Sequence, residues 1–100
     1  MLVVRFKVRC QPDKTQLLIA AFQELISATR KLKGVINFDI GRDLADSDSF
    51  IATEVFEDRA ALDRQESLAE VQKTMALLGE VLTESPQATI YHVSSSEPWG

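Results

Sequence analysis

Apolar and polar residues alternate along the first ten positions of the chain. One side of this segment carries Leu2, Val4, Phe6, Val8 and Cys10. The other side carries Val3, Arg5, Lys7 and Arg9. A period of two is typical of a half-buried β-strand, so the pattern predicts a strand over residues 2–10 that ends before Pro12.

Two later segments repeat their apolar residues at helical spacing. The first spans about residues 14–32, with an apolar side made by Leu18, Phe22, Leu25, Ile26 and Leu32. The second follows Asp58, a suitable N-cap, and breaks where Ser67 and Glu70 have capping-box spacing. We expect a short helix over 59–65 and a longer one over 68–82. The stripe of the longer helix is predicted to be core: Leu68, Val71, Met75, Leu78 and Leu82.

Three more strands are expected, over residues 35–43, 50–57 and 88–93. Ile36, Phe38 and Ile40 share one side of the first, and a polar turn over 45–49 joins it to the second as a hairpin. In the second, Glu54 falls on the same side as Phe50, Ala52 and Phe56. A carboxylate in line with aromatic residues points into a half-buried space, where its charge requires a partner or water.

The predicted order is β-α-β-β-α-β, which is typical of a ferredoxin-like α+β fold with two helical regions on one face of a four-stranded antiparallel sheet. The other face is expected to remain uncovered, although it is predicted to carry Val3, Val35, Ile51, Val55 and Tyr91. An apolar face of this kind predicts a homodimer built sheet to sheet. We expect one domain over 1–94 and a loosely ordered tail over 95–100, where Trp99 is able to dock on a partner subunit.

Composition narrows the class of protein. With 45% hydrophobic residues, a net charge of -4 and a pI of about 4.9, the chain resembles a soluble globular protein and is a poor partner for nucleic acid or a membrane. Cys10 is the only cysteine, which fits the reducing cytoplasm, and we expect it to act as a small buried hydrophobe. The charged residues among the first ten argue against a signal peptide.

Glu54 is the strongest candidate for acid–base chemistry, since burial raises the pKa of a carboxyl group. The alternative is a structural carboxylate paired with an arginine or a helix N-terminus. Gln65 is expected either to orient a substrate oxygen or to cap the end of the short helix. Neither choice follows from the sequence.

The remaining candidates have equally plain alternatives. Phe22, Phe38 and Phe56 are candidate walls of an aromatic-binding pocket, although phenylalanines on core faces are more often simply core. Arg42 could hold an anionic substrate or pair with nearby aspartates. His92 is a candidate base or a strand-edge residue. One histidine and one cysteine are too few to predict a metal site.

Several of these features together resemble the antibiotic-biosynthesis monooxygenase family of small dimeric α+β barrels. Gly34, Phe38 and Asp39 match its second strand, Arg42-Asp43 its turn, and Phe50 and Glu54 its third strand. Asp58, Ala61, Leu62 and Asp63 match its helix start. The resemblance covers about residues 2–93. It implies the fold and the dimer, and a reaction of oxygen with a substrate anion that needs no metal, flavin or haem.

The chain departs from the family pattern where chemistry is expected. Phe56 stands where the family commonly has tryptophan, and Gln65 and Ala69 stand where it commonly has histidine. Phe56 keeps an apolar wall but loses an N–H donor, and Gln65 cannot act as a base near neutral pH. Haem degradation, another activity in the family, is disfavoured because the histidine that would be the axial ligand of the haem is absent.

Three functions therefore remain as hypotheses. The first is a cofactor-independent monooxygenase for a quinol-like or polyphenolic substrate, with Glu54 as the acid–base group and Gln65 as an orienting donor. The second is a dimeric barrel that binds a small aromatic ligand without turnover. The third is an isomerase or another enzyme for small carbonyl compounds that uses Glu54 alone. A cavity of about 300 Å³ or more near Glu54 favours a ligand, whereas a sealed core favours loss of the family chemistry.

Overall fold

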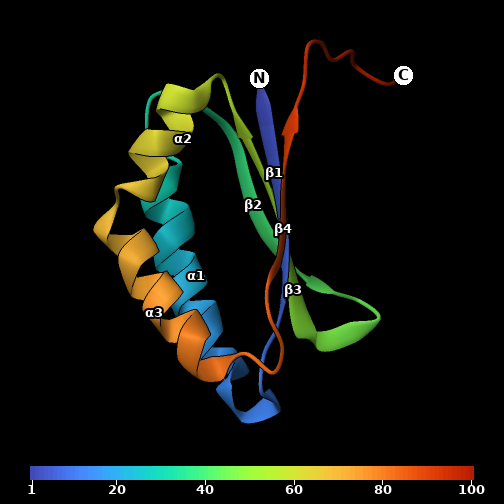
Figure 1. The fold of residues 1–100 in the computed structure, drawn as a ribbon. Coiled ribbons are helices and arrows are strands. Elements are labelled where there is room, and N and C mark those ends of the chain that lie inside the picture. Colours follow the sequence, from blue (N-terminus) through green and yellow to red (C-terminus); the bar gives the residue numbers. More distant parts are fainter.

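A computed structural model describes all 100 residues and has the predicted order of elements. The elements are β1 (Leu2–Arg9), a short 3-10 turn η1 (Pro12–Lys14), α1 (Thr15–Thr29), β2 (Val35–Asp43), β3 (Asp46–Phe56), α2 (Arg59–Glu66), α3 (Ala69–Val81) and β4 (Gln87–His92). The four strands form one antiparallel sheet in the order β2-β3-β1-β4, with all helices on one face (Figure 1). This is the predicted ferredoxin-like α+β fold.

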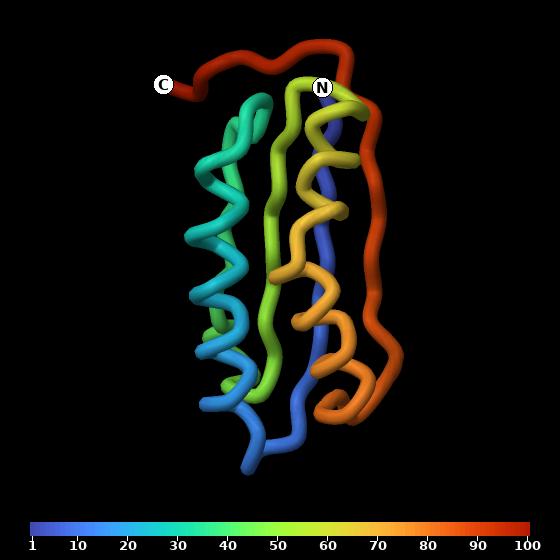
Figure 2. The backbone as a smooth tube through the Cα atoms, turned by 90° about the vertical axis from the view of Figure 1, so that its left-hand side faces the viewer, coloured from blue at the N-terminus to red at the C-terminus, as the bar shows by residue number.

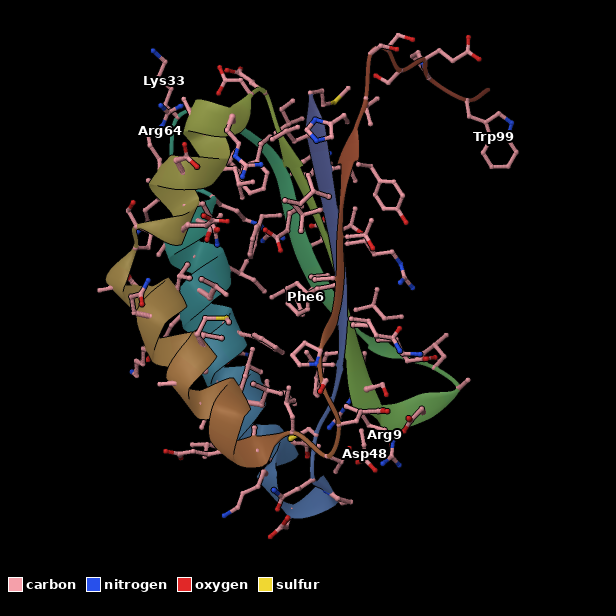
Figure 3. All side chains as sticks on the ribbon, in the orientation of Figure 1. Phe6, Arg9, Lys33, Asp48, Arg64 and Trp99 are labelled. Carbon is pink, nitrogen blue, oxygen red and sulfur yellow. The ribbon has the colours of Figure 1, made fainter.

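The helical layer consists of α1 and the α2–α3 pair, which lie side by side over the sheet (Figure 2). None of these helices is long and apolar enough to cross a membrane. The residues after β4 run away from the sheet and helices, and Trp99 near their end is fully exposed (Figure 3).

The alternation along β1 and β3 is confirmed. Phe50, Ala52, Glu54 and Phe56 are all buried on the helical side of β3. Glu54 lies opposite Val4 of β1 and Phe38 of β2, so apolar neighbours flank it on both sides. Cys10 is fully buried, as expected, and burial raises the pKa of its thiol.

The predicted sides of β2 are wrong at its first two residues. Val35 pairs with Phe56 and packs against the core, whereas Ile36 is 50% exposed. The pairing shifts by one residue between Val35 and Asn37, which marks a β-bulge at Ile36. A bulge adds one unpaired residue and so exchanges the sides of the residues before it. Ile36, not Val35, therefore joins the uncovered side of the sheet.

The turn after β2 is also shorter than predicted, since β3 begins at Asp46 and leaves only Leu44 and Ala45 between the strands. Asp46 is fixed there by Arg9, whose Nε donates to its carboxylate at 3.1 Å, and by the Ser49 hydroxyl, which donates at 2.8 Å. These bonds extend the hairpin into the stretch that the sequence suggested was a polar turn.

Close contacts at one end of the sheet fix the position of α2. Gly34 has a φ of +86°, and a Cβ on it would lie 2.7 Å from the Ala61 Cβ, so only glycine fits there. The Asp58 carboxylate accepts from the Ala61 N–H at 2.9 Å and caps α2 as predicted. Arg64 donates to the Lys33 carbonyl, and Figure 3 shows the two residues together. These contacts fix α2 on the sheet, and so hold Gln65, one turn after Ala61, over the sheet.

The predicted caps and core of α3 need two corrections. Ser67 does not cap α3; its hydroxyl donates to the Asp63 carbonyl and closes the end of α2 instead. Met75 is 59% exposed, whereas its neighbour Thr74 is 4% exposed and occupies the inward position. Because positions 74 and 75 are neighbours on the same turn, a search for apolar residues alone selects the wrong one.

Candidate functional site

A cavity of about 290 Å³ lies between the sheet and the α2–α3 pair. The sheet lines it with Val4, Phe6, Val8, Phe38, Glu54, Ala88 and Ile90, and the helices line it with Leu25, Leu62, Gln65, Glu66, Val71, Thr74, Met75 and Leu78, with Pro86 before β4 completing it. Figure 3 shows Phe6 pointing from β1 into the space between the two layers. Met75 and Ile90 are 59% and 40% exposed, so the cavity opens to solvent between α3 and β4. Its volume is just below the lower end of the range typical of small-molecule sites.

Glu54 comes from β3, an inner strand of the sheet, and lines the sheet side of the cavity. Only 6% of the surface of Glu54 is exposed. Burial raises its pKa from an ordinary 4.5 to about 7, and the negative charge of Glu66 contributes to the same shift. A carboxyl group with a pKa near neutrality can both accept and donate a proton under physiological conditions, which is the requirement for an acid–base group.

Gln65 and Thr74 face Glu54 from the helical layer. Gln65 is 6% exposed and comes from α2, and Thr74 is 4% exposed and comes from α3. Apart from these residues and Glu66 at the exposed end of α2, the lining is apolar, so three buried polar side chains from three different elements converge in a largely hydrophobic enclosure. Such a combination positions and orients a small ligand.

None of these three side chains is satisfied by the protein itself. Glu54, Gln65 and Thr74 take part in none of the side-chain hydrogen bonds or ion pairs of the chain. The only fully enclosed side-chain oxygen or nitrogen without a partner is Thr29 Oγ1. The polar atoms of the three residues are therefore reachable from the cavity rather than sealed in the core. They are available to a ligand.

This geometry argues against a structural role for Glu54, because neither an arginine nor a backbone N–H of a helix N-terminus bonds to its carboxylate. It likewise disfavours Gln65 as a helix cap, since its amide makes no bond to the end of α2. That end is closed by Ser67 instead.

Four residues expected to contact a substrate lie outside the cavity lining. Phe56 is fully buried in the hydrophobic core. Phe22 packs edge-on against Phe50 with ring centroids 5.6 Å apart. His92 is exposed at the end of β4, opposite Leu2. These residues lie on predicted strands and helices, but the sequence pattern does not show which end of the core remains open.

The fourth residue, Arg42, is exposed on β2, and its guanidinium lies 5.3 Å from the centre of the Phe50 ring. It borders a separate shallow depression of about 230 Å³, between α1 and β2. It makes no ion pair with the neighbouring aspartates, since Asp43 pairs with Lys7 and both Asp46 and Asp48 pair with Arg9. Of the five expected aromatic and charged contacts, only Phe38 lines the cavity with Glu54.

Two polar lining residues were missed by sequence reasoning. Thr74 was hidden inside an apolar helical stripe, and the signal that could have found it is a hydroxyl three residues after Val71 and four before Leu78. Glu66 follows directly after Gln65 and lies at the exposed end of α2. Nothing in the spacing distinguishes it from Asp63, the other surface carboxylate of that helix.

Comparison with known proteins shows the family of this chain. A family model described as antibiotic biosynthesis monooxygenase matches residues 1–77. The chain belongs to this family. The match covers β1 to most of α3, and so includes Glu54, Gln65 and Thr74. The family resemblance inferred from the strand and helix motifs is therefore confirmed.

Individual relatives are distant. The uncharacterized protein sll1783 of Synechocystis is 26% identical over 96 residues, which cover 96% of this chain but 65% of that protein. This chain thus spans just under two-thirds of the length of that curated relative. Protein SO0527 of Shewanella oneidensis has a TM-score of 0.84 at 27% identity, covering 92% of this chain and 89% of its own. Rv0793 of Mycobacterium tuberculosis has a TM-score of 0.88 at 22% identity, covering 97% and 98%, and supports the fold.

The cavity carries few groups suited to a metal or haem. Its lining contains neither histidine nor cysteine, and the chain has no cluster of three or more histidine, cysteine, aspartate or glutamate side chains arranged to hold a metal ion. The chemistry that its residues can perform is proton transfer at Glu54, with hydrogen bonds from Gln65 and Thr74.

Proposed function

We propose that the protein is a cofactor-independent monooxygenase that acts on a small quinol-like or polyphenolic molecule. The observation that supports this most directly is Glu54, a buried carboxyl group without a protein partner that faces an apolar cavity and has a pKa of about 7. A phenol hydroxyl in the cavity donates its proton to this carboxylate. The resulting phenolate is electron-rich enough to reduce oxygen.

The step balances with the substrate as the only reductant. The phenolate transfers an electron to O₂, and the two radicals join at a ring carbon that carries hydrogen to give a peroxide anion, which takes the proton held by Glu54 and becomes a hydroperoxide. Loss of water from that hydroperoxide leaves a quinone, so one oxygen atom enters the product and the other leaves as water. The substrate loses two hydrogens in all. Glu54 returns the phenol proton to the peroxide oxygen and then takes the hydrogen of the ring carbon as a proton while the O–O bond breaks, and this proton and the departing hydroxide form the water.

The other lining residues support this sequence of events. The Gln65 amide N–H donates to the phenolate oxygen and holds its charge in place, as a preorganised donor does. The apolar wall made by residues such as Phe38 and Leu62 excludes water from the ring. Thr74 adds a hydroxyl that can donate to a second oxygen of a polyphenol.

A second candidate is a non-catalytic barrel that binds a small aromatic ligand. Two observations favour it: the modest 290 Å³ volume, and glutamine where the family commonly has histidine. An isomerase that uses Glu54 alone would have the same cavity, but it would not consume oxygen.

Oxygen consumption with a panel of quinols and phenols separates these functions. We expect uptake with at least one electron-rich member, coupled to quinone formation, and a loss of about 100-fold or more in Glu54→Gln, which keeps the shape of the side chain but cannot accept the proton. Glu80→Gln, on the outer surface of α3, is the matched control. Ligand binding with no uptake at any pH would favour the non-catalytic barrel, and isomerisation without uptake would favour the third function.

The uncovered face of the sheet is the proposed site of self-association. Val3, Ile51 and Val55 are only half-buried there, and Ile36 and Tyr91 are each 50% exposed. These residues are apolar, come from all four strands and have no helix over them (Figure 1). Pairing with the same face of a second copy would bury them and close a barrel of two sheets.

A further inference from the structure

The charged groups of the cavity are all of one sign. Glu54 and Glu66 are the only ionisable side chains in its lining, and no lysine, arginine or histidine is among them. Glu66 takes part in no ion pair of the chain. A ligand in the cavity therefore meets two carboxyl groups and no compensating positive charge from the protein.

The polar groups inside the cavity independently indicate a ligand. Glu54, Gln65 and Thr74 are each more than nine-tenths buried, yet their polar atoms face the cavity without a partner in the chain. Buried polar groups normally have hydrogen-bond partners, because leaving them unpaired destabilises the fold. The position of Glu66, exposed at the end of α2, places its carboxylate at the solvent side of the same enclosure.

We propose that the ligand of this cavity is an aromatic molecule that carries a protonated amine, with the ring in the apolar interior and the ammonium group beside Glu66. Glu66 is then the residue that determines specificity by charge. The inference rests on the proposed ligand site around Glu54 and adds the class of molecule that occupies it. Aromatic carboxylates, sulfates and phosphates of the same size are excluded, because each would bring a negative charge toward two carboxyl groups.

An ammonium group at this position also affects the reaction. Glu66 contributes to the raised pKa of Glu54 through its negative charge. A bound cation cancels part of that charge and so favours the ionised form of Glu54, which is the form that accepts a proton. A cationic substrate thereby activates the base that acts on it, whereas a neutral phenol does not.

Calorimetric binding of three probes with one ring system tests the proposal: 2-naphthylmethylamine, 2-naphthylmethanol and 2-naphthoate at neutral pH and low salt. We expect the amine to bind about tenfold tighter than the alcohol and the carboxylate to bind weakest, which corresponds to about 1.4 kcal/mol for the first step. The preference should diminish as salt is added.

Variants at Glu66 assign the preference. Glu66→Gln should reduce the difference in affinity between the amine and the carboxylate, and Glu66→Lys should reverse the order of the two affinities. Glu80→Lys makes the same change of charge on the outside of α3 and should leave the order unchanged. Binding of the probes without a charge preference, or a preference that Glu66→Lys does not alter, overturns this inference and leaves the proposed site intact. Binding of none of the three probes overturns both.

Discussion

Glu54 and Glu66 face the same cavity from β3 and α2, and the charge of Glu66 adds to burial in raising the pKa of Glu54 to about 7. The two carboxyl groups therefore differ in role although they share one enclosure. The buried one holds a proton that can be exchanged near neutral pH, and the exposed one tunes how readily that proton leaves. This division is a property of their surroundings, since the side chains are chemically identical.

The raised pKa makes folding stability depend on pH. The native state holds a proton on Glu54 up to about pH 7, whereas an unfolded glutamate releases it near its ordinary value of 4.5. The native state thus binds more protons between these values. The contribution of Glu54 to folding stability is therefore fully present below about pH 4.5 and is lost as pH rises from there through about 7. We expect Glu54→Gln, measured by urea unfolding, to match the parent near pH 4 and to exceed it by up to about 3 kcal/mol at pH 8.

The exposed Glu80→Gln variant provides the control, because Glu80 lies on α3 outside the cavity lining. A difference between Glu54→Gln and the parent that is the same at pH 4 and pH 8 would show that the native carboxyl group titrates normally. The expected gain in stability at the cost of activity is typical of functional sites.

Removing the charge of Glu66 should change the titration of Glu54 itself. Glu66 raises the pKa of Glu54, so Glu66→Gln is expected to lower it, although burial, the larger cause, remains. Carbon-13 NMR of the glutamate side chains follows this titration directly, and oxygen uptake should rise through the same lower pH range. An unchanged Glu54 titration in Glu66→Gln would show that the two groups do not interact.

Gln65 offers a substitution that separates ligand contact from folding. Its amide makes no hydrogen bond within the chain, so Gln65→Leu keeps the bulk of the side chain and removes only a contact to the ligand. We expect unchanged or slightly increased stability and weaker binding of a phenol, by about 1 kcal/mol for the lost hydrogen bond. Calorimetry and urea unfolding on the same samples measure both. Equal affinity in the variant would remove Gln65 from the site.

The sequence predicts the strands well where one face is buried throughout. Along β3, Phe50 to Phe56 alternate without interruption, and every predicted inward residue is buried. The same rule of alternation fails in β2, because of the bulge at Ile36. Val35 and Ile36 are both β-branched and apolar, so neither composition nor period indicates which of them faces the core.

The candidate site is predictable only in part, because a cavity is what side chains leave unfilled. A carboxylate on an apolar face was enough to single out Glu54 and Gln65 followed from the resemblance, whereas Thr74 was passed over for the neighbouring Met75. Phe56 and Phe38 have the same type and similar burial, yet only Phe38 lines the cavity. That difference depends on where α2 and α3 lie over the sheet, which periodicity does not encode.

The caps of α2 make a further test of its role in holding Gln65 over the sheet. Asp58 accepts from the Ala61 N–H at the start of this helix, and Ser67 donates to the Asp63 carbonyl at its end. Loss of an N-cap costs about 1 kcal/mol, so Asp58→Ala should lower the free energy of unfolding by that amount and weaken ligand binding. Ser67→Ala serves as the comparison, and we expect a smaller loss. Equal effects of the two would argue against the N-terminal cap as the main anchor of α2.

The proposed dimer depends on the uncovered face of the sheet, and Val55 lies among its apolar residues, one residue before the end of β3. It pairs with Val3 on one side and Asn37 on the other, so a lysine at this position would place charge within the apolar area. We expect Val55→Lys to raise the dissociation constant of a dimer by about tenfold or more in sedimentation equilibrium, because an unpaired charge is costly to bury among apolar residues. Leu17→Lys is the matched control, since Leu17 is a 53% exposed apolar residue on α1, away from the sheet. A dimer that Leu17→Lys disrupts and Val55→Lys does not would place the interface on the helices, and a parent chain that remains monomeric at all concentrations would exclude it altogether.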